Sequence, residues 1–147
     1  MVGRLKDRWE AVWQKLGART VSQNSLDELI KAYSSPGRFY HTLAHIEDCL
    51  SVFDQTKSLA FHPTEMELAI WFHDSVYETH SSDNEQKSAE WARATIEGLR
   101  IDNNTSDRVA DLILATRHTN KTTDADAQLI MDVDLSILGR EVDVFWR

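Results

Sequence analysis

Proline and glycine are scarce in this chain of 147 residues, which contains two prolines and five glycines. Both residues interrupt regular structure, so their scarcity leaves room for long helices. Apolar residues recur mostly at spacings of three and four, and no segment shows the alternation of period two that is typical of strands. The sequence therefore predicts an all-α protein, a compact helical bundle. Its length fits a single domain over residues 1–147.

Cysteine, positive charge and long apolar runs are also in short supply. The single cysteine, Cys49, cannot form an internal disulfide, and no signal peptide is recognisable at the N-terminus, so we expect a reducing, cytoplasmic setting. The chain has 16 Lys and Arg against 24 Asp and Glu, and its net charge of −8 argues against nucleic acid or an anionic membrane as a partner. No apolar run approaches the roughly 20 residues that a membrane helix needs.

The apolar spacing divides the chain into helical segments. Ser25 with Glu28 has the spacing of a capping box, Pro63 suits a first helical position, Asp83 is placed to cap a helix, and Gly139 suits a helix end. The predicted helices cover residues 3–16, 25–33, 41–56, 63–74, 83–98, 106–117 and 124–138, and another begins over 141–147.

Polar groups that can bind metal ions interrupt the apolar helices at four places. They are His41 and His45, the doublet His73-Asp74, His118, and Asp132 with Asp134. Imidazole and carboxylate groups are natural ligands of manganese, iron, zinc, cobalt, nickel and, less readily, magnesium. A buried carboxylate is costly unless a cation or a hydrogen-bond network compensates it. Neighbouring helical residues diverge by about 100°, so both residues of the doublet can reach one ion only in a groove between helices.

Ordinary structural roles compete with this interpretation, because a lone histidine near a core is more often hydrogen-bonded than ligating. We expect no functional role for two histidines in polar loops and a small buried apolar role for the cysteine, and a surface or capping role is the ordinary alternative for three charged residues. These residues are His62 and His80, then Asp83, Glu85 and Lys87, then Cys49. The ordered set of histidine, His-Asp doublet and later aspartate favours the metal site.

This ordered set resembles the HD superfamily of metal-dependent phosphohydrolases, which is named for the His-Asp doublet. Four blocks carry the resemblance, namely RFYHTLAHI (38–46), WFHDSVYE (71–78), DNEQKSA (83–89) and MDVDLSILG (131–139). They look like a bacterial group described as predicted HD phosphohydrolases of unknown substrate. The resemblance covers roughly residues 30–140.

The resemblance implies a set of functional residues and a reaction. It implies one divalent ion, with a second as an option, and hydrolysis of a phosphate ester or anhydride of a small metabolite such as a nucleotide. His41 stays an alternative to His45 as a ligand, and Asp132 to Asp134. The implied ligands are His45, His73, Asp74 and Asp134. Asp74 also holds the attacking water, and Glu85 is either the general base or a residue that orients the groups of the site. The side chains expected to meet phosphate are Arg38, His41, Lys87 and His118, the last of which is also the candidate ligand of a second ion.

Two other functions fit the same residues. The first alternative is a non-catalytic HD module that binds a metal or nucleotide and acts as a sensor or partner domain. The second, weaker one is a two-iron oxygenase, for which no second full ligand set is visible. Members of the group generally continue well past the last aspartate, whereas this chain ends at residues 145–147. We therefore expect either a truncated C-terminus or a homo-oligomer in which a second copy covers the open face.

Overall fold

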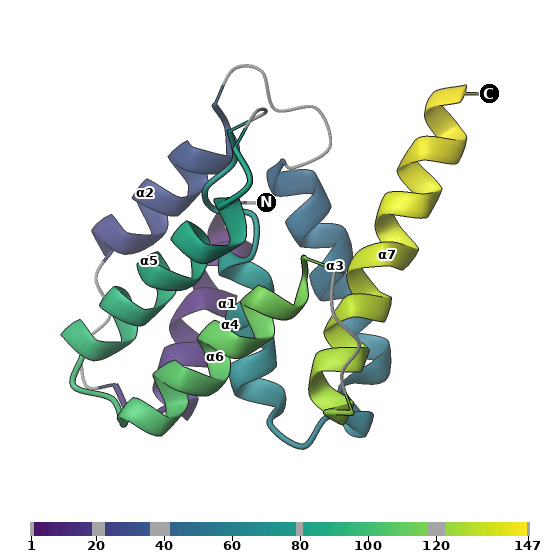
Figure 1. The fold of residues 1–147 in the computed structure, drawn as a ribbon. Helices are drawn as coiled ribbons and strands as arrows, with labels where there is room; N and C mark the ends of the chain where they lie inside the picture. The colour runs from purple at the N-terminus through teal and green to yellow at the C-terminus, as the bar shows by residue number, and fades with distance from the viewer. Residues whose placement is uncertain (1, 19–22, 36–41, 79–80, 118–122, 147) are drawn as a thin grey trace.

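The computed structural model describes residues 2–18, 23–35, 42–78, 81–117 and 123–146, with the backbone alone for 2–3, 23–24 and 137–146. Every regular element in these ranges is helical, so the predicted all-α class is confirmed (Figure 1). The elements are α1 (Val2–Lys15), α2 (Gln23–Tyr33), α3 (Leu43–Thr56), the short 3-10 helix η1 (Lys57–Leu59), α4 (Pro63–Phe72), α5 (Asn84–Gly98), α6 (Asn103–Ala115) and α7 (Ala125–Trp146).

Helix α4 is the centre of the core. It packs against α1, α3, α5, α6 and α7, and its residues from Leu68 to Phe72 are all buried. A helix that is apolar on every side can only be stable inside a protein. Trp71 also meets Trp9 of α1 edge to face, with ring centroids 5.2 Å apart. The apolar run of the sequence thus becomes the buried axis of the bundle, and the His73-Asp74 doublet lies at its end.

The remaining helices surround α4 on different sides. Figure 1 shows α7 alongside α3 on one side of the molecule and α2 with α5 on the other. Helix α6 packs against α4, α5 and α7. Among the described helices, none combines the length and apolar composition needed to cross a membrane.

Several helix ends differ from the predicted ones. Helix α2 begins at Gln23, so Ser25 lies inside it and the predicted capping box is wrong. Helix α6 begins at Asn103 rather than at 106, because the Asp102 carboxylate accepts a hydrogen bond from the Asn104 amide at 2.9 Å. Asp83 does precede α5, yet its side chain forms no cap hydrogen bond.

The last predicted boundary is also wrong. Helix α7 continues through Gly139 to Trp146, so residues 141–146 extend this helix instead of beginning another. A glycine inside a helix costs about 1 kcal/mol relative to alanine. That cost is small enough for the hydrogen bonds of a continuous helix to offset it.

Candidate metal centre

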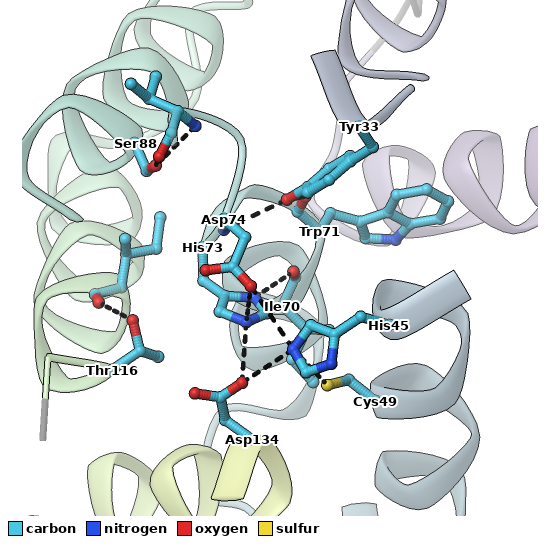
Figure 2. A network of polar contacts seen from close by, with 12 residues as sticks. Tyr33, His45, Cys49, Ile70, Trp71, His73, Asp74, Ser88, Thr116 and Asp134 are labelled. Atoms are coloured by element: carbon cyan, nitrogen blue, oxygen red, sulfur yellow. Dashed lines mark hydrogen bonds and ion pairs between the residues drawn. The ribbon is translucent and has the colours of Figure 1, made fainter. Parts of the chain in front are cut away.

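Four polar side chains from three helices meet beside the core (Figure 2). His45 comes from α3, His73 and Asp74 follow the last residue of α4, and Asp134 comes from α7. His45 Nε2 lies 3.0 Å from Asp134 Oδ1, and His73 Nε2 lies 3.2 Å from the same oxygen. We call these four residues the His-Asp cluster.

Asp74 approaches both imidazoles with one carboxylate oxygen. Its Oδ2 lies 3.2 Å from His73 Nε2 and 3.5 Å from His45 Nε2. The Asp74 side chain is 15% exposed, whereas that of His45 is fully buried and that of His73 is 2% exposed. Asp74 is therefore the most accessible member of the cluster, and any ligand from solvent would arrive on its side.

The end of α4 fixes how the His73 ring is turned. His73 keeps helical backbone angles at the C-cap position, and its Nδ1 lies 2.7 Å from the carbonyl oxygen of Ile70. A carbonyl only accepts hydrogen bonds, so Nδ1 carries the proton and donates it to Ile70. The opposite ring nitrogen, Nε2, then points at the carboxylates of Asp74 and Asp134.

Helix α7 is held in register by its first turn. The Asp126 carboxylate accepts hydrogen bonds from the backbone amides of Phe61 and His62, at 2.8 and 2.9 Å. Asp134 lies eight residues later, so its side chain projects about 80° around the helix axis from that of Asp126. Ile130 and Val133 of the same helix are buried. The Asp126 contacts thus fix the start of α7 against the segment that precedes α4.

The cluster needs a positive charge at its centre. If His73 were neutral, the Nε2 lone pair would face two carboxylate oxygens at 3.2 Å, which is repulsive. Burial alone would lower the pKa of His73, but the carboxylates of Asp74 and Asp134 outweigh burial and hold that pKa well above its ordinary value. For Asp134 burial alone would raise the pKa of the carboxyl. Hydrogen bonds from His45 and His73 outweigh burial and hold the pKa of Asp134 well below its ordinary value. A proton or a metal cation can supply the missing charge.

The spacing of the donor atoms fits a metal ion. Donors bound to zinc at about 2.0–2.3 Å lie roughly 3.3–3.7 Å apart when tetrahedral, and octahedral neighbours at about 2.1 Å lie roughly 3.0 Å apart. The four N···O distances in the cluster run from 3.0 to 3.5 Å. Single donor atoms of His45, Cys49, His73 and Asp134 all lie within 4.8 Å of one another, which is close enough to hold a metal ion.

Cys49 is a neighbour of the cluster that the sequence reading did not include. It was expected to be a small buried apolar residue, and it is fully buried, but its Sγ lies 3.6 Å from His45 Nε2. The signal in the sequence was the spacing of four between His45 and Cys49, which places both side chains on one face of α3. Tyr33 was also missed, and its hydroxyl accepts a hydrogen bond from the Asp74 amide at 3.3 Å.

Other predicted site residues lie away from the cluster or at the surface. Asp132 is exposed, while Asp134 is 5% exposed, so of these two alternatives only Asp134 reaches the histidines. Glu85 is half-buried in the first turn of α5, and no described contact joins it to the cluster. Lys87 is exposed and forms an ion pair with Asp83 at 3.7 Å. Three further candidates, Arg38, His41 and His118, lie outside the described residues.

Two surface hollows of about 400 Å³ each lie elsewhere in the described part of the chain. One is bordered by His62, Glu65 and Arg108, at the other end of α4 from His73. The second is bordered by Arg4, Arg8 and residues of α3. No residue of the His-Asp cluster borders either hollow.

The arrangement as a whole is a buried cluster of two imidazoles and two carboxylates, in which the Asp74 side chain, at 15% exposed, is the most accessible. Two imidazole nitrogens and two carboxylate oxygens form a donor set for a borderline divalent ion. Comparison of the chain with protein-family models, with curated proteins and with solved structures gave no match.

Proposed function

We propose that this protein is a metal-dependent phosphohydrolase whose divalent ion is bound by His45, His73, Asp74 and Asp134. The observation that supports the ion most strongly is the direction of His73. Its Nδ1 is engaged by the Ile70 carbonyl, so its Nε2 faces two carboxylates, an arrangement that a cation between them would stabilise. His45 adds a second buried imidazole at 3.0 Å from the same Asp134 oxygen.

The reaction class rests on the motifs of the sequence. The blocks around residues 38–46, 71–78, 83–89 and 131–139 resemble those of HD phosphohydrolases and come in the same order. Phosphate ester or anhydride hydrolysis is the chemistry that such a resemblance implies, with a small phosphorylated metabolite such as a nucleotide as substrate. A bound divalent ion would act as a Lewis acid on a phosphoryl oxygen and lower the pKa of a water to about 7.

The residues would divide the work according to their exposure. His45, His73 and Asp134 are buried and hydrogen-bonded, so they are suited to hold the ion without moving. Asp74 points one oxygen at both imidazoles and is partly exposed, so it can bind the ion and also accept a hydrogen bond from the attacking water. The water oxygen bonds to phosphorus, and the bond from phosphorus to the leaving oxygen breaks. Glu85 in α5 either takes up the proton that the water loses or orients the water for attack.

Binding of the phosphate requires positive groups, since the chain carries a net charge of −8. The proposed groups are Arg38, His41, Lys87 and His118. Lys87 is occupied by the exposed pair with Asp83, and surface pairs of this kind contribute only about 0–1 kcal/mol. An incoming phosphate can therefore displace Asp83 from Lys87 at little cost.

The test is a screen for phosphate release from phosphorylated metabolites, including nucleoside mono-, di- and triphosphates, with manganese, cobalt, nickel, zinc or magnesium added. We expect turnover that a chelator abolishes and that Asp74→Ala lowers about a hundredfold or more. Asp132→Asn is the matched control, because Asp132 is exposed on the helix that carries Asp134. If the protein bound metal but turned over none of these substrates, the proposed phosphohydrolase activity would be wrong. The alternative of a non-catalytic metal-binding module would then be favoured.

A further inference from the structure

Cys49 lies one helical turn after His45, and both side chains are fully buried. The Cys49 Sγ is 3.6 Å from His45 Nε2, and it lies within 4.8 Å of the donor atoms of His73 and Asp134. Figure 2 shows the sulfur next to His45 and the Asp74 carboxylate above both imidazoles, on another side of the His45 ring. The sulfur next to the cluster is therefore fully buried, whereas the Asp74 carboxylate is partly exposed.

The distance between sulfur and nitrogen is that of two ligands on one metal. With bonds of about 2.05 Å to nitrogen and about 2.3 Å to sulfur, the two atoms lie about 3.1 Å apart at 90° and about 3.8 Å apart at 120°, which are angles of a five-coordinate ion. The observed 3.6 Å lies between these values. Packing alone would account for a small buried side chain at this position, but it does not require the sulfur to point at the ring nitrogen that also faces Asp134. Positions four apart share one face of α3, so both residues can bind one metal ion from the same helix.

We infer that Cys49 binds the metal ion directly, from the buried side, and that the centre therefore takes zinc, cobalt or ferrous iron in preference to magnesium or manganese. This inference rests on the proposed metal centre and narrows the identity of its ion. Thiolate ligands favour the softer ions, whereas carboxylate and water ligands alone suit magnesium and manganese. Because Cys49 lies on the buried side, the position beside Asp74 stays open to water and substrate.

The chain has a single cysteine, so a sulfur ligand can be detected without ambiguity. The protein is stripped of metal, loaded with Co²⁺ and freed of excess ion, and its absorption spectrum is recorded. We expect the visible bands of bound cobalt together with a near-ultraviolet band from thiolate-to-cobalt charge transfer. In Cys49→Ser and Cys49→Ala the near-ultraviolet band disappears and the visible bands persist, shifted in position. Asp48→Asn, an exposed change on the same helix, keeps the whole spectrum.

Competition between metals gives a second measurement. We expect the preference for Zn²⁺ over Mn²⁺ to fall about tenfold or more in Cys49→Ser, because an oxygen ligand replaces a sulfur ligand. Visible cobalt bands in the wild-type protein without a near-ultraviolet band would overturn the sulfur ligand and leave the metal centre intact. If the wild-type protein retained no cobalt at all, the metal centre and this inference would both be wrong.

Discussion

The hydroxyl of Tyr33 lies 3.3 Å from the backbone amide of Asp74 and accepts its hydrogen bond. The same hydroxyl donates to the carbonyl oxygen of Trp71 at 2.7 Å. Helix α2 thereby holds the backbone on both sides of His73 in place. Tyr33 is 2% exposed, so no solvent replaces these bonds if they are lost.

Replacing Tyr33 by phenylalanine should weaken both the fold and the metal site. Removing the hydroxyl leaves the Trp71 carbonyl and the Asp74 amide without this partner, which costs about 1 kcal/mol in the free energy of unfolding. We also expect metal affinity to fall about tenfold, because the group that orients the doublet is lost. Urea unfolding and metal titration check the two effects, and unchanged values in both would contradict a positioning role for Tyr33.

Asp134 and Asp132 offer a matched pair of substitutions on α7. Divalent metal at about a hundred times its dissociation constant stabilises a protein by about 2.7 kcal/mol, which in a chain of this size raises the Tm by about 5–10 °C. We expect this rise in the wild-type protein and in Asp132→Asn. In Asp134→Asn metal affinity should fall about a hundredfold or more, and the rise should vanish.

Scanning calorimetry with and without metal measures this difference. Asp132 is exposed and Asp134 is buried, so the two variants remove the same charge from the same helix in different surroundings. Equal responses to metal in the two variants would contradict a role for Asp134 as a ligand.

The stability of the metal-free protein should depend on pH through His73 and Asp134. The pKa of His73 is raised above 6.5 by folding, so its contribution is complete below pH 6.5 and is lost as the pH rises through the higher folded value. The pKa of Asp134 is lowered below 3.8, so its contribution is complete above pH 3.8 and is lost as the pH falls through the lower folded value. Their ion pair is therefore complete between about pH 4 and 6.5.

Urea unfolding of the wild-type protein and of Asp134→Asn at pH values within and on both sides of this range measures the contribution of the His73–Asp134 ion pair to stability. The difference in unfolding free energy should be largest between about pH 4 and 6.5 and smaller on both sides. Saturating metal should remove the loss at alkaline pH, because a cation replaces the proton on His73. A difference that stays constant from acid to alkaline pH would show that the two groups do not form this pair.

The pair of Arg108 and Glu65 allows fold stability to be changed without touching the metal site. Arg108 Nη2 donates to Glu65 Oε1 at 2.7 Å, and Glu65 is 7% exposed. Arg108→Ala leaves this carboxylate without its main partner and should lower the free energy of unfolding by about 1–3 kcal/mol. Because Glu65 lies at the start of α4 and His73 follows its end, metal affinity should stay unchanged. A large loss of metal affinity would mean that the site depends on general stability.

The parts of the fold that the sequence predicts best are those with a strong local signal. Pro63 and the apolar run to Phe72 predict a buried helix, and they place the His-Asp doublet at its end. Asp134 lies among aliphatic residues and follows Val133 on the inward face, so its burial is also readable from spacing. The end of α7 cannot be predicted from the sequence in this way. The cost of Gly139 in a helix is too small to decide whether the helix ends there or continues.

The contacts that complete the centre depend on the tertiary structure. Tyr33 is 41 residues before Asp74 in the chain, and a tyrosine in an apolar stripe predicts burial but not the partner of its hydroxyl. Cys49 fits the apolar stripe of α3 equally well as a core residue or as a ligand. Only the approach of α4 and α7 to the same face of α3 brings imidazole, carboxylate and sulfur together.

The central claim is that one divalent ion lies between His45, His73 and the two aspartates. Anomalous diffraction from a crystal saturated with cobalt or zinc tests it directly. We expect one strong anomalous peak about 2.0–2.3 Å from His45 Nε2, His73 Nε2 and an Asp134 oxygen, with Asp74 on its exposed side. Density without a peak there, with His73 Nε2 still hydrogen-bonded to Asp134, would contradict a metal centre.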